Sequence, residues 1–233
     1  KANKDEDDFR LRFIHSGIMK TPELSVLEAS KEIHSYAERT HRMFGMVRDL
    51  LTTKDDDAFE KLYERIEKYE GISDNMEVEI AKYLDQVSDA HLSDDTKEKV
   101  RDMLREITEI ESIGDSCFNI ARTISRLRSS KEEFTESQYD NIKHMFELTD
   151  DALSQMSVVL IKHKREVDVN RTFAIESDIN NYRALLRTQN INDINEHKYS
   201  YTAGTLYMDI IQECEKLGDY IVNVVEARMC IRK

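Results

Sequence analysis

The sequence contains very few of the residues that interrupt helices. Its 233 residues include one proline, six glycines and no tryptophan. Such a chain has little material for the tight turns that all-β folds need, and it offers no glycine-rich phosphate loop. Charged residues make up 35% and apolar residues 39%, a composition typical of long solvated helices. We therefore expect an all-α fold.

Cysteine is scarce, and its spacing suggests neither a disulfide framework nor a zinc site. Cys117, Cys214 and Cys230 are an odd set without a CxxC pair or a cysteine–histidine ligand spacing. Such a set is typical of reduced thiols in a cytosolic compartment, where they serve as small core hydrophobes. We expect all three to be free.

Long apolar runs and a leader are also missing. No stretch of about eighteen apolar residues occurs, so we expect that this segment does not itself span a membrane and carries no signal peptide. The chain begins at Lys1 rather than at a methionine, which fits a piece of a longer protein but equally fits cloning or trimming.

Charge is strongly unbalanced toward acid. The formal net charge is −13, so the surface field should repel nucleic acid and anionic lipid headgroups. The same field favours metal cations or basic patches of other proteins. We expect no nucleic-acid partner.

Apolar residues recur at steps of three and four and predict six helices. Thr21 and Pro22 should begin the first of them, and the sequence from Phe134 to Tyr139 should begin the fourth with a capping box. The helices are expected at about 22–52, 59–89, 95–128, 135–164, 168–196 and 201–228. Residues 1–20 are expected to be a linker or arm, residues 21–130 a first three-helix bundle and residues 131–233 a second.

The two halves contain an internal repeat. Glu109 to Asn119 aligns with Glu213 to Asn223 at a constant offset, and the Glu-x-x-Gly-Asp-x-x-x-Asn pattern matches at every polar position. We interpret this repeat as two tandem antiparallel three-helix bundles related by a pseudo-twofold axis.

Acidic residues line one flank of the second and third predicted helices. In an antiparallel hairpin, residues at equal height have a constant sum of position numbers, and Glu70 with Asp115 has the same sum as Asp74 with Glu111. The four carboxylates should therefore meet in one layer and raise one another's pKa unless something positive lies among them. Oxygen ligands alone favour a hard cation such as Mg²⁺, Ca²⁺, Mn²⁺ or iron. The alternatives are pairing with lysine or arginine of neighbouring helices, or a solvated acidic face.

The second half repeats this arrangement with a substitution. Glu215 and Asp219 match the acids of the third helix, but the fifth helix offers Glu176 and Asn180. Because a neutral amide replaces one carboxylate, we expect this second layer to hold a cation weakly or not at all.

These acid pairs, together with Ile113-Gly114-Asp115 and Leu217-Gly218-Asp219, resemble the PhoU family over nearly the whole chain from Pro22. The resemblance implies a paired three-helix-bundle fold, carboxylate-bound metal in some members, and a regulatory role in phosphate uptake without catalysis. The family's carboxylate motif carries over to Glu70, Asp74, Glu111, Asp115, Glu215 and Asp219. It fails at Asn180, which puts the second metal cluster in doubt.

Residues 13–23 and 69–77 look more narrowly like the C-terminal region of bacterial sodium/phosphate cotransporters. That resemblance implies a cytoplasmic domain tethered to the inner membrane by an upstream transmembrane region, with the membrane-embedded half of the transporter as its partner. The alternative is a free-standing PhoU-type adaptor that contacts phosphate-signalling proteins. Either form could assemble as a homo-oligomer.

Two other classes are less consistent with the sequence. An enzyme should show a nucleophile elbow, a phosphate loop or a telling cysteine–histidine pair, and none occurs. A ferritin-like di-iron carboxylate protein needs Glu-x-x-His on two helices, but only Glu38 with His41 fits, so this alternative is remote.

Overall fold

The computed structural model describes residues 11–14, 21–162 and 164–231. These residues form long helices and contain no strand, as the composition predicts. The helices are α1 (Pro22–Thr52), α2 (Asp56–Ser88), α3 (Asp94–Ser129), α4 (Glu136–Ile161), α5 (Val169–Asn195) and α6 (Tyr201–Met229), with a short 3₁₀ turn at Lys164–Glu166.

Local sequence signals explain where the helices begin. Thr135 and Gln138 form the predicted reciprocal capping box of α4. The rings of Phe134 and Tyr139 pack 5.6 Å apart across the same helix start. Pro22 occupies the first turn of α1 as predicted, although the Thr21 side chain caps no backbone N–H. Helix α4 ends at Ile161, a little earlier than predicted, and the 3₁₀ turn at Lys164–Glu166 separates it from α5.

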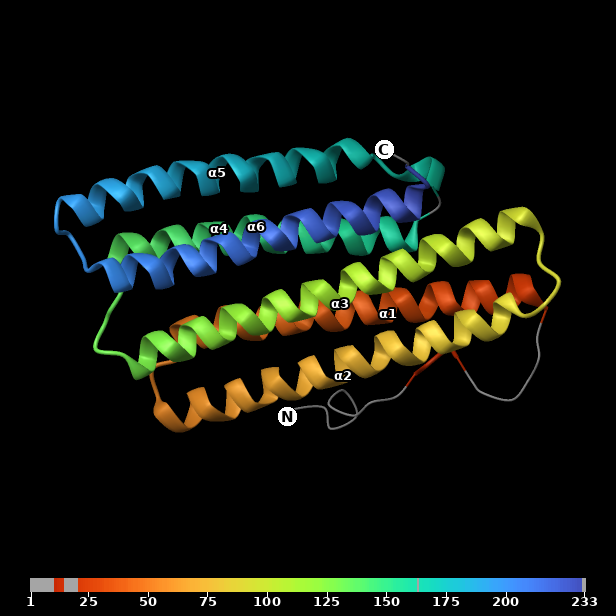
Figure 1. Cartoon of the computed structure of the whole chain (residues 1–233), viewed down its shortest axis with the longest axis horizontal. Coiled ribbons are helices and arrows are strands. Elements are labelled where there is room, and N and C mark those ends of the chain that lie inside the picture. The colour runs from red at the N-terminus through yellow and green to blue at the C-terminus, as the bar shows by residue number, and fades with distance from the viewer. Residues whose placement is uncertain (1–10, 15–20, 163, 232–233) are drawn as a thin grey trace.

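The helices form two three-helix bundles that lie side by side with their long axes aligned (Figure 1). Helices α1, α2 and α3 contact one another in the first bundle, while α4 and α5 both pack on α6 in the second. Between the bundles, α3 packs along α6 and α1 packs on α4. The predicted all-α arrangement of two three-helix bundles is confirmed. The assignment of 21–130 and 131–233 as separate domains stays a prediction.

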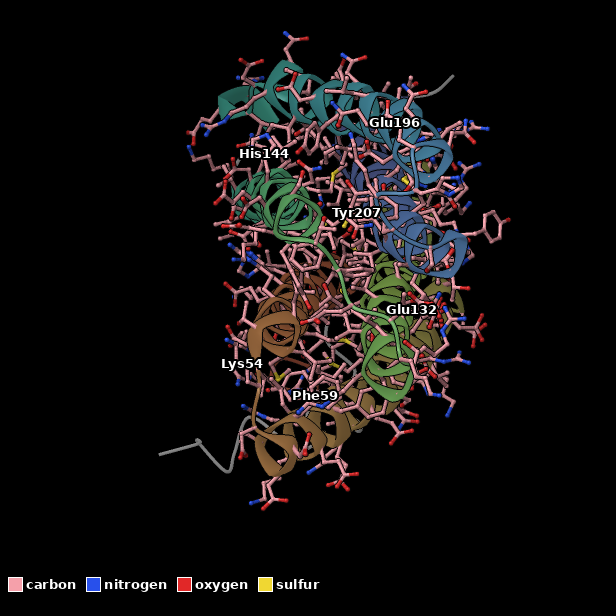
Figure 2. The ribbon with its side chains drawn as sticks, turned by 90° about the vertical axis from the view of Figure 1, so that its left-hand side faces the viewer. Lys54, Phe59, Glu132, His144, Glu196 and Tyr207 are labelled. Atoms are coloured by element: carbon pink, nitrogen blue, oxygen red, sulfur yellow. The ribbon has the colours of Figure 1, made fainter. Side chains whose placement is uncertain are left out.

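One apolar interior runs through both bundles. Side chains fill the space between the helices in the end-on view (Figure 2), and the buried residues form one continuous cluster. Phe44 of α1 and Phe146 of α4 meet edge to face at 5.4 Å in this interior. All three cysteines are free, and Cys117 and Cys214 are buried, as expected. The expectation that Cys230 is also a core residue is wrong, because it caps the C-terminal end of α6 and is exposed there.

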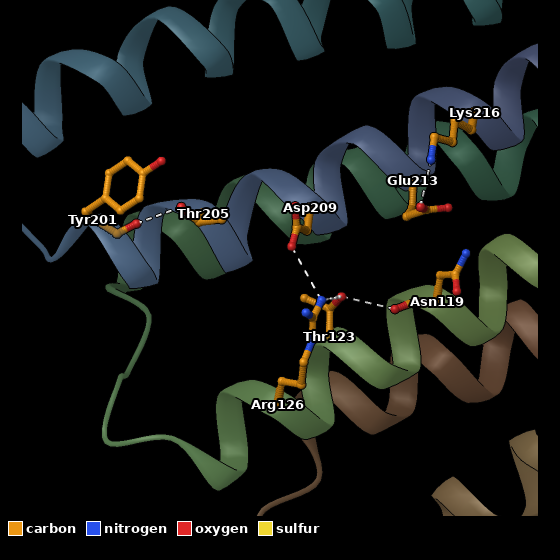
Figure 3. A network of polar contacts seen from close by, with 8 residues as sticks. All are labelled: Asn119, Thr123, Arg126, Tyr201, Thr205, Asp209, Glu213 and Lys216. Atoms are coloured by element: carbon orange, nitrogen blue, oxygen red, sulfur yellow. Dashed lines mark hydrogen bonds and ion pairs between the residues drawn. The ribbon is translucent and has the colours of Figure 1, made fainter.

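Polar contacts fix the register of α3 against α6. The Arg126 guanidinium donates to Asp209 across the seam at 3.4 Å and to the Thr123 hydroxyl at 3.0 Å (Figure 3). Farther along, the Asn223 amide donates to Glu109 at 3.1 Å, so one residue of the repeated pattern contacts the other copy of the pattern. The repeat therefore builds the interface between the bundles as well as each bundle.

Most of the predicted arm lies outside the described residues, but residues 11–14 make a specific contact. The backbone N–H groups of Arg12 and Phe13 donate to the Glu32 carboxylate at 2.9 and 2.7 Å, and that of Ile14 donates at 3.3 Å. Glu32 is fully buried on α1, and Ile14 is buried beside it. This part of the arm is therefore anchored to the first bundle.

Within the described part of the chain, no helix is both long and apolar enough to cross a bilayer.

Candidate metal centre

Helices α2 and α3 approach each other closely where the acidic residues lie. A Cβ atom added at Gly114 would stand only 2.8 Å from the Ser73 hydroxyl oxygen. Ser73 is buried and donates to the Tyr36 hydroxyl at 3.1 Å, so its side chain is held in place. The glycine of the Ile113-Gly114-Asp115 motif is therefore needed because a larger residue would push the helices apart.

The hairpin brings three of the predicted acids together. One carboxylate oxygen from each of Glu70, Asp74 and Asp115 lies within 4.8 Å of the others. Glu111 stands one turn before Asp115 on α3 and shares a hydrogen bond with it. We call Glu70, Asp74, Glu111 and Asp115 the first layer.

The first layer is electrostatically strained. Partial burial, followed by the neighbouring charge of Asp115, raises the pKa of Asp74 above its ordinary value. Burial likewise raises the pKa of Glu70, with Asp74 and Asp115 adding to the effect. The pKa of Glu111 rises to about 8, first through burial and then through its hydrogen bond with Asp115 and the charge of Asp115. A cation among these groups would relieve this strain.

Within the part of the chain that the structure describes, no basic side chain pairs with these acids. Among the ion pairs of the described residues, none joins a lysine or an arginine to any member of the first layer. The structure therefore does not favour the alternative in which neighbouring basic side chains pair these acids. Asp74 and Asp115 are exposed, so a cation can reach the layer from solvent.

The geometry fits a hard cation. A Ca²⁺ ion takes oxygen ligands at about 2.3–2.6 Å, so two ligands on opposite sides stand about 5 Å apart. The 4.8 Å spread of Glu70, Asp74 and Asp115 falls inside that span. Mg²⁺, with bonds of about 2.0–2.1 Å, would require the carboxylates to close slightly. The cluster contains no histidine or cysteine, so it does not offer the ligands that favour zinc.

The repeated positions in the second bundle, Glu176, Asn180, Glu215 and Asp219, form what we call the second layer. Here the structure supplies a basic partner that the sequence analysis missed, because Arg183 of α5 forms an ion pair with Glu215. The Arg183 Nε atom lies 2.7 Å from Glu215 Oε2, and Nη2 donates to Oε1 at 3.0 Å. The Asn180 amide donates to Glu176 at 2.5 Å.

Asp219 is exposed and lies beside Glu176 and Asn223 in a shallow cleft. The contact between α5 and α6 is also looser, since a Cβ at Gly218 would meet the end of the Ile179 side chain at 3.4 Å. In the second layer the protein's own side chains therefore satisfy Glu215 and Glu176.

The residues of the di-iron alternative do not lie in a carboxylate cluster. His41 Nε2 lies 2.8 Å from Asp150 of α4. Glu38 faces His34, 3.7 Å away. His41 thus joins α1 to α4 at the edge of the bundles.

Residues 33–124 match the family model described as PhoU domain. The match includes the whole first layer and ends before the second. Among curated protein sequences, no significant match is found.

Two solved structures share the fold. PhoU from Pseudomonas aeruginosa aligns with a TM-score of 0.75 and 12% identity, over 88% of this chain and 95% of that one. The phosphate transport system regulatory protein PhoU from Streptococcus pneumoniae aligns with a TM-score of 0.64 and 18% identity, over 89% of this chain and 91% of that one. The chain therefore contains a PhoU domain match within a PhoU-like fold.

Proposed function

We propose that this chain is a PhoU-type regulator of phosphate uptake that acts by binding other proteins rather than by catalysis. The observation that carries the proposal is the PhoU domain match over residues 33–124 within a fold that aligns with PhoU structures over most of its length. The two acidic layers lie where the repeat places them, and neither resembles a nucleophile with a base.

Of the two forms of such a regulator, we favour the free-standing adaptor that contacts phosphate-signalling proteins on the cytoplasmic side of the membrane. The alignment with the Pseudomonas structure extends over 95% of that chain, so the full PhoU architecture is represented. The second candidate is the tethered domain of a sodium/phosphate cotransporter. It is supported by residues 13–23 and 69–77, which resemble that class and lie partly outside the described residues.

Within this role, we assign the first layer to a hard divalent or ferric cation. The cation would bridge Glu70 and Asp74 of α2 with Asp115 of α3, and Glu111 would join as it loses its proton. Bound there, it would tie the two helices of the hairpin together and hold the outer face of the first bundle in one shape for a partner. The second layer, where Arg183 already neutralises Glu215, has no comparable need for a cation.

Deleting the coding region in its host and measuring phosphate uptake tests the regulatory role. In the deletion strain, we expect phosphate uptake in phosphate-rich medium to exceed that of the wild type or to stop responding to the phosphate concentration. Uptake that matches the wild type at every phosphate concentration would contradict it.

The parent strain, in which the gene is intact, distinguishes the two forms, and the deletion strain is the blank. An antibody to this chain should detect a small polypeptide in the soluble fraction if the adaptor is correct. A larger band that pellets with membranes, and that crosslinks within its own polypeptide, would favour the cotransporter domain instead.

A further inference from the structure

A groove between α1 and α2 is rich in arginine. Its volume is about 500 Å³, and it contains no member of either acidic layer. In a chain with a net charge of −13, three arginines line this groove against one acid. The groove is lined by Arg42, Gly45, Met46, Arg48 and Asp49 from α1 and by Arg65 and Tyr69 from α2.

The wall of the groove is rigid. Tyr69 is buried, and its ring stacks with two guanidinium groups, that of Arg65 at 5.6 Å and that of Arg39 at 5.3 Å. Arg39 is only 4% exposed, so one of the two guanidinium groups on the Tyr69 ring is itself buried. Cation–π packing thus holds these charges in place before any ligand arrives.

One of the groove-lining arginines has a donor without a partner among the described residues. The Nε atom of Arg42 is shielded from solvent and makes no hydrogen bond to any described residue. A buried N–H of this kind is costly unless a ligand or an ordered water accepts its hydrogen bond. Arg48 contacts Asp150 at 3.5 Å, but His41 binds the other oxygen of the same carboxylate at 2.8 Å. Asp150 therefore contacts both His41 and Arg48, and it offsets part of the charge of Arg48.

A glycine keeps the groove open. Gly45 lies in the interior of α1, where glycine is an unfavourable helix residue. A Cβ atom added there would meet nothing within 4 Å. The position has room for a side chain, and the missing side chain leaves a gap between Arg42 and Arg48 that a small ligand can enter.

We infer that this groove is an oxyanion site that binds a phosphate group, either free inorganic phosphate or the phosphate of a small ester. The planar guanidinium offers paired N–H donors that match the oxygens of phosphate, and several arginines together favour a dianion over chloride. A groove of this volume accommodates a phosphate and a small organic remainder. The inference goes beyond the proposed function because it uses none of the six candidate metal ligands.

The test is isothermal titration calorimetry of the full chain in chloride buffer with EDTA, using inorganic phosphate and glycerol 3-phosphate as separate ligands. EDTA removes any cation from the first layer, so binding that survives EDTA is independent of the metal proposal. We expect saturable binding of at least one of the two ligands. Binding of phosphate alone or of both identifies free phosphate as sufficient, and binding of the ester alone identifies an ester site.

Four variants locate the binding. Arg42→Gln and Arg48→Gln should each weaken it at least tenfold. Gly45→Leu should abolish it by filling the gap, whereas the matched control Gly45→Ala should retain it within about threefold, because one methyl group leaves the groove open. Circular dichroism identifies any variant that fails to fold, and the remaining variants then decide the result. Absence of heat with both ligands, or affinity unchanged in a folded Arg42→Gln chain, would overturn the inference.

Discussion

The first and second layers occupy repeated positions, but the negative charge of their carboxylates is compensated in different ways. In the second layer, Arg183 neutralises Glu215 and the Asn180 amide satisfies Glu176, so the protein supplies its own compensation. In the first layer, Asp74 takes the place of the amide, and no described lysine or arginine pairs with the acids. The repeat therefore preserves the positions at which the helices meet. Single substitutions decide whether the carboxylates of a layer are compensated by the protein's own side chains or need a ligand.

The largest expected effect is on cation binding. Asp115→Ala should lower the affinity of the chain for Ca²⁺ or Mn²⁺ at least about 100-fold, because it removes the carboxylate that α3 contributes to the cluster. Asp219→Ala, at the repeated position, should change affinity less than about threefold. Thermal denaturation at increasing cation concentration measures both. Equal losses from the two variants would mean that the layers are equivalent.

The ion pair of Arg183 with Glu215 should make the second layer contribute to the stability of the chain without a cation. Arg183→Gln should lower the free energy of unfolding by about 1–3 kcal/mol, because it leaves the half-buried Glu215 carboxylate without its ion pair. Urea denaturation measures the change. In the double variant Arg183→Gln with Asn180→Asp, a cation should bind the second layer and raise the free energy of unfolding, as we expect for the first layer of the wild type. If the double variant does not respond to cation, charge compensation is not what distinguishes the layers.

The two layers also differ in how closely the helices pack at their glycines, Gly114 in the first and Gly218 in the second. Gly114→Ala should destabilise the chain by about 1–2 kcal/mol, since its Cβ would stand 2.8 Å from a hydroxyl that is held by Tyr36. Gly218→Ala should be neutral or stabilising by up to about 1 kcal/mol, because its Cβ meets only ordinary contact at 3.4 Å and alanine favours the helix. Thermal midpoints of the two variants in EDTA provide the comparison. A Gly114→Ala chain as stable as wild type would show that the helices can separate at little cost.

The layers should also differ in how the stability of the chain depends on pH in the absence of cations. The raised pKa of Glu111 means that the folded chain binds a proton more tightly than the unfolded chain does. Its contribution to the free energy of unfolding should therefore fall as pH rises from about 4.5 to about 8. Glu111→Gln should flatten this dependence, while Glu215→Gln should leave it in place. Urea midpoints in EDTA across this pH range measure the slope, and a wild-type slope that persists in Glu111→Gln would assign it to other groups.

The sequence predicts the helices and the first layer well because both depend on local or regular geometry. Helix starts follow from capping residues such as Thr135, and the meeting of Glu70, Asp74 and Asp115 follows from the constant sum of positions in an antiparallel hairpin. Gly114 is visible in the repeated motif, although only the structure shows that Ser73 is the reason for it.

The remaining features depend on tertiary contacts that the spacing of residues in the sequence does not predict. Glu32 looks like an ordinary helical acid, yet it accepts hydrogen bonds from the arm, which is distant from it in sequence. Arg183 was detectable in principle, since it lies one helical turn after Asn180 on the same flank of α5. The arginine groove was missed because Arg42, Arg48 and Arg65 come from two helices and form no motif in the sequence.

Crystals soaked in Mn²⁺ and examined by anomalous diffraction test the central claim most directly. We predict a strong peak bounded by Glu70, Asp74 and Asp115, and no peak beside Glu215 and Asp219. Peaks of equal height in both layers, or a peak only in the second, would contradict the account, as would the absence of any peak in the first layer at saturating Mn²⁺.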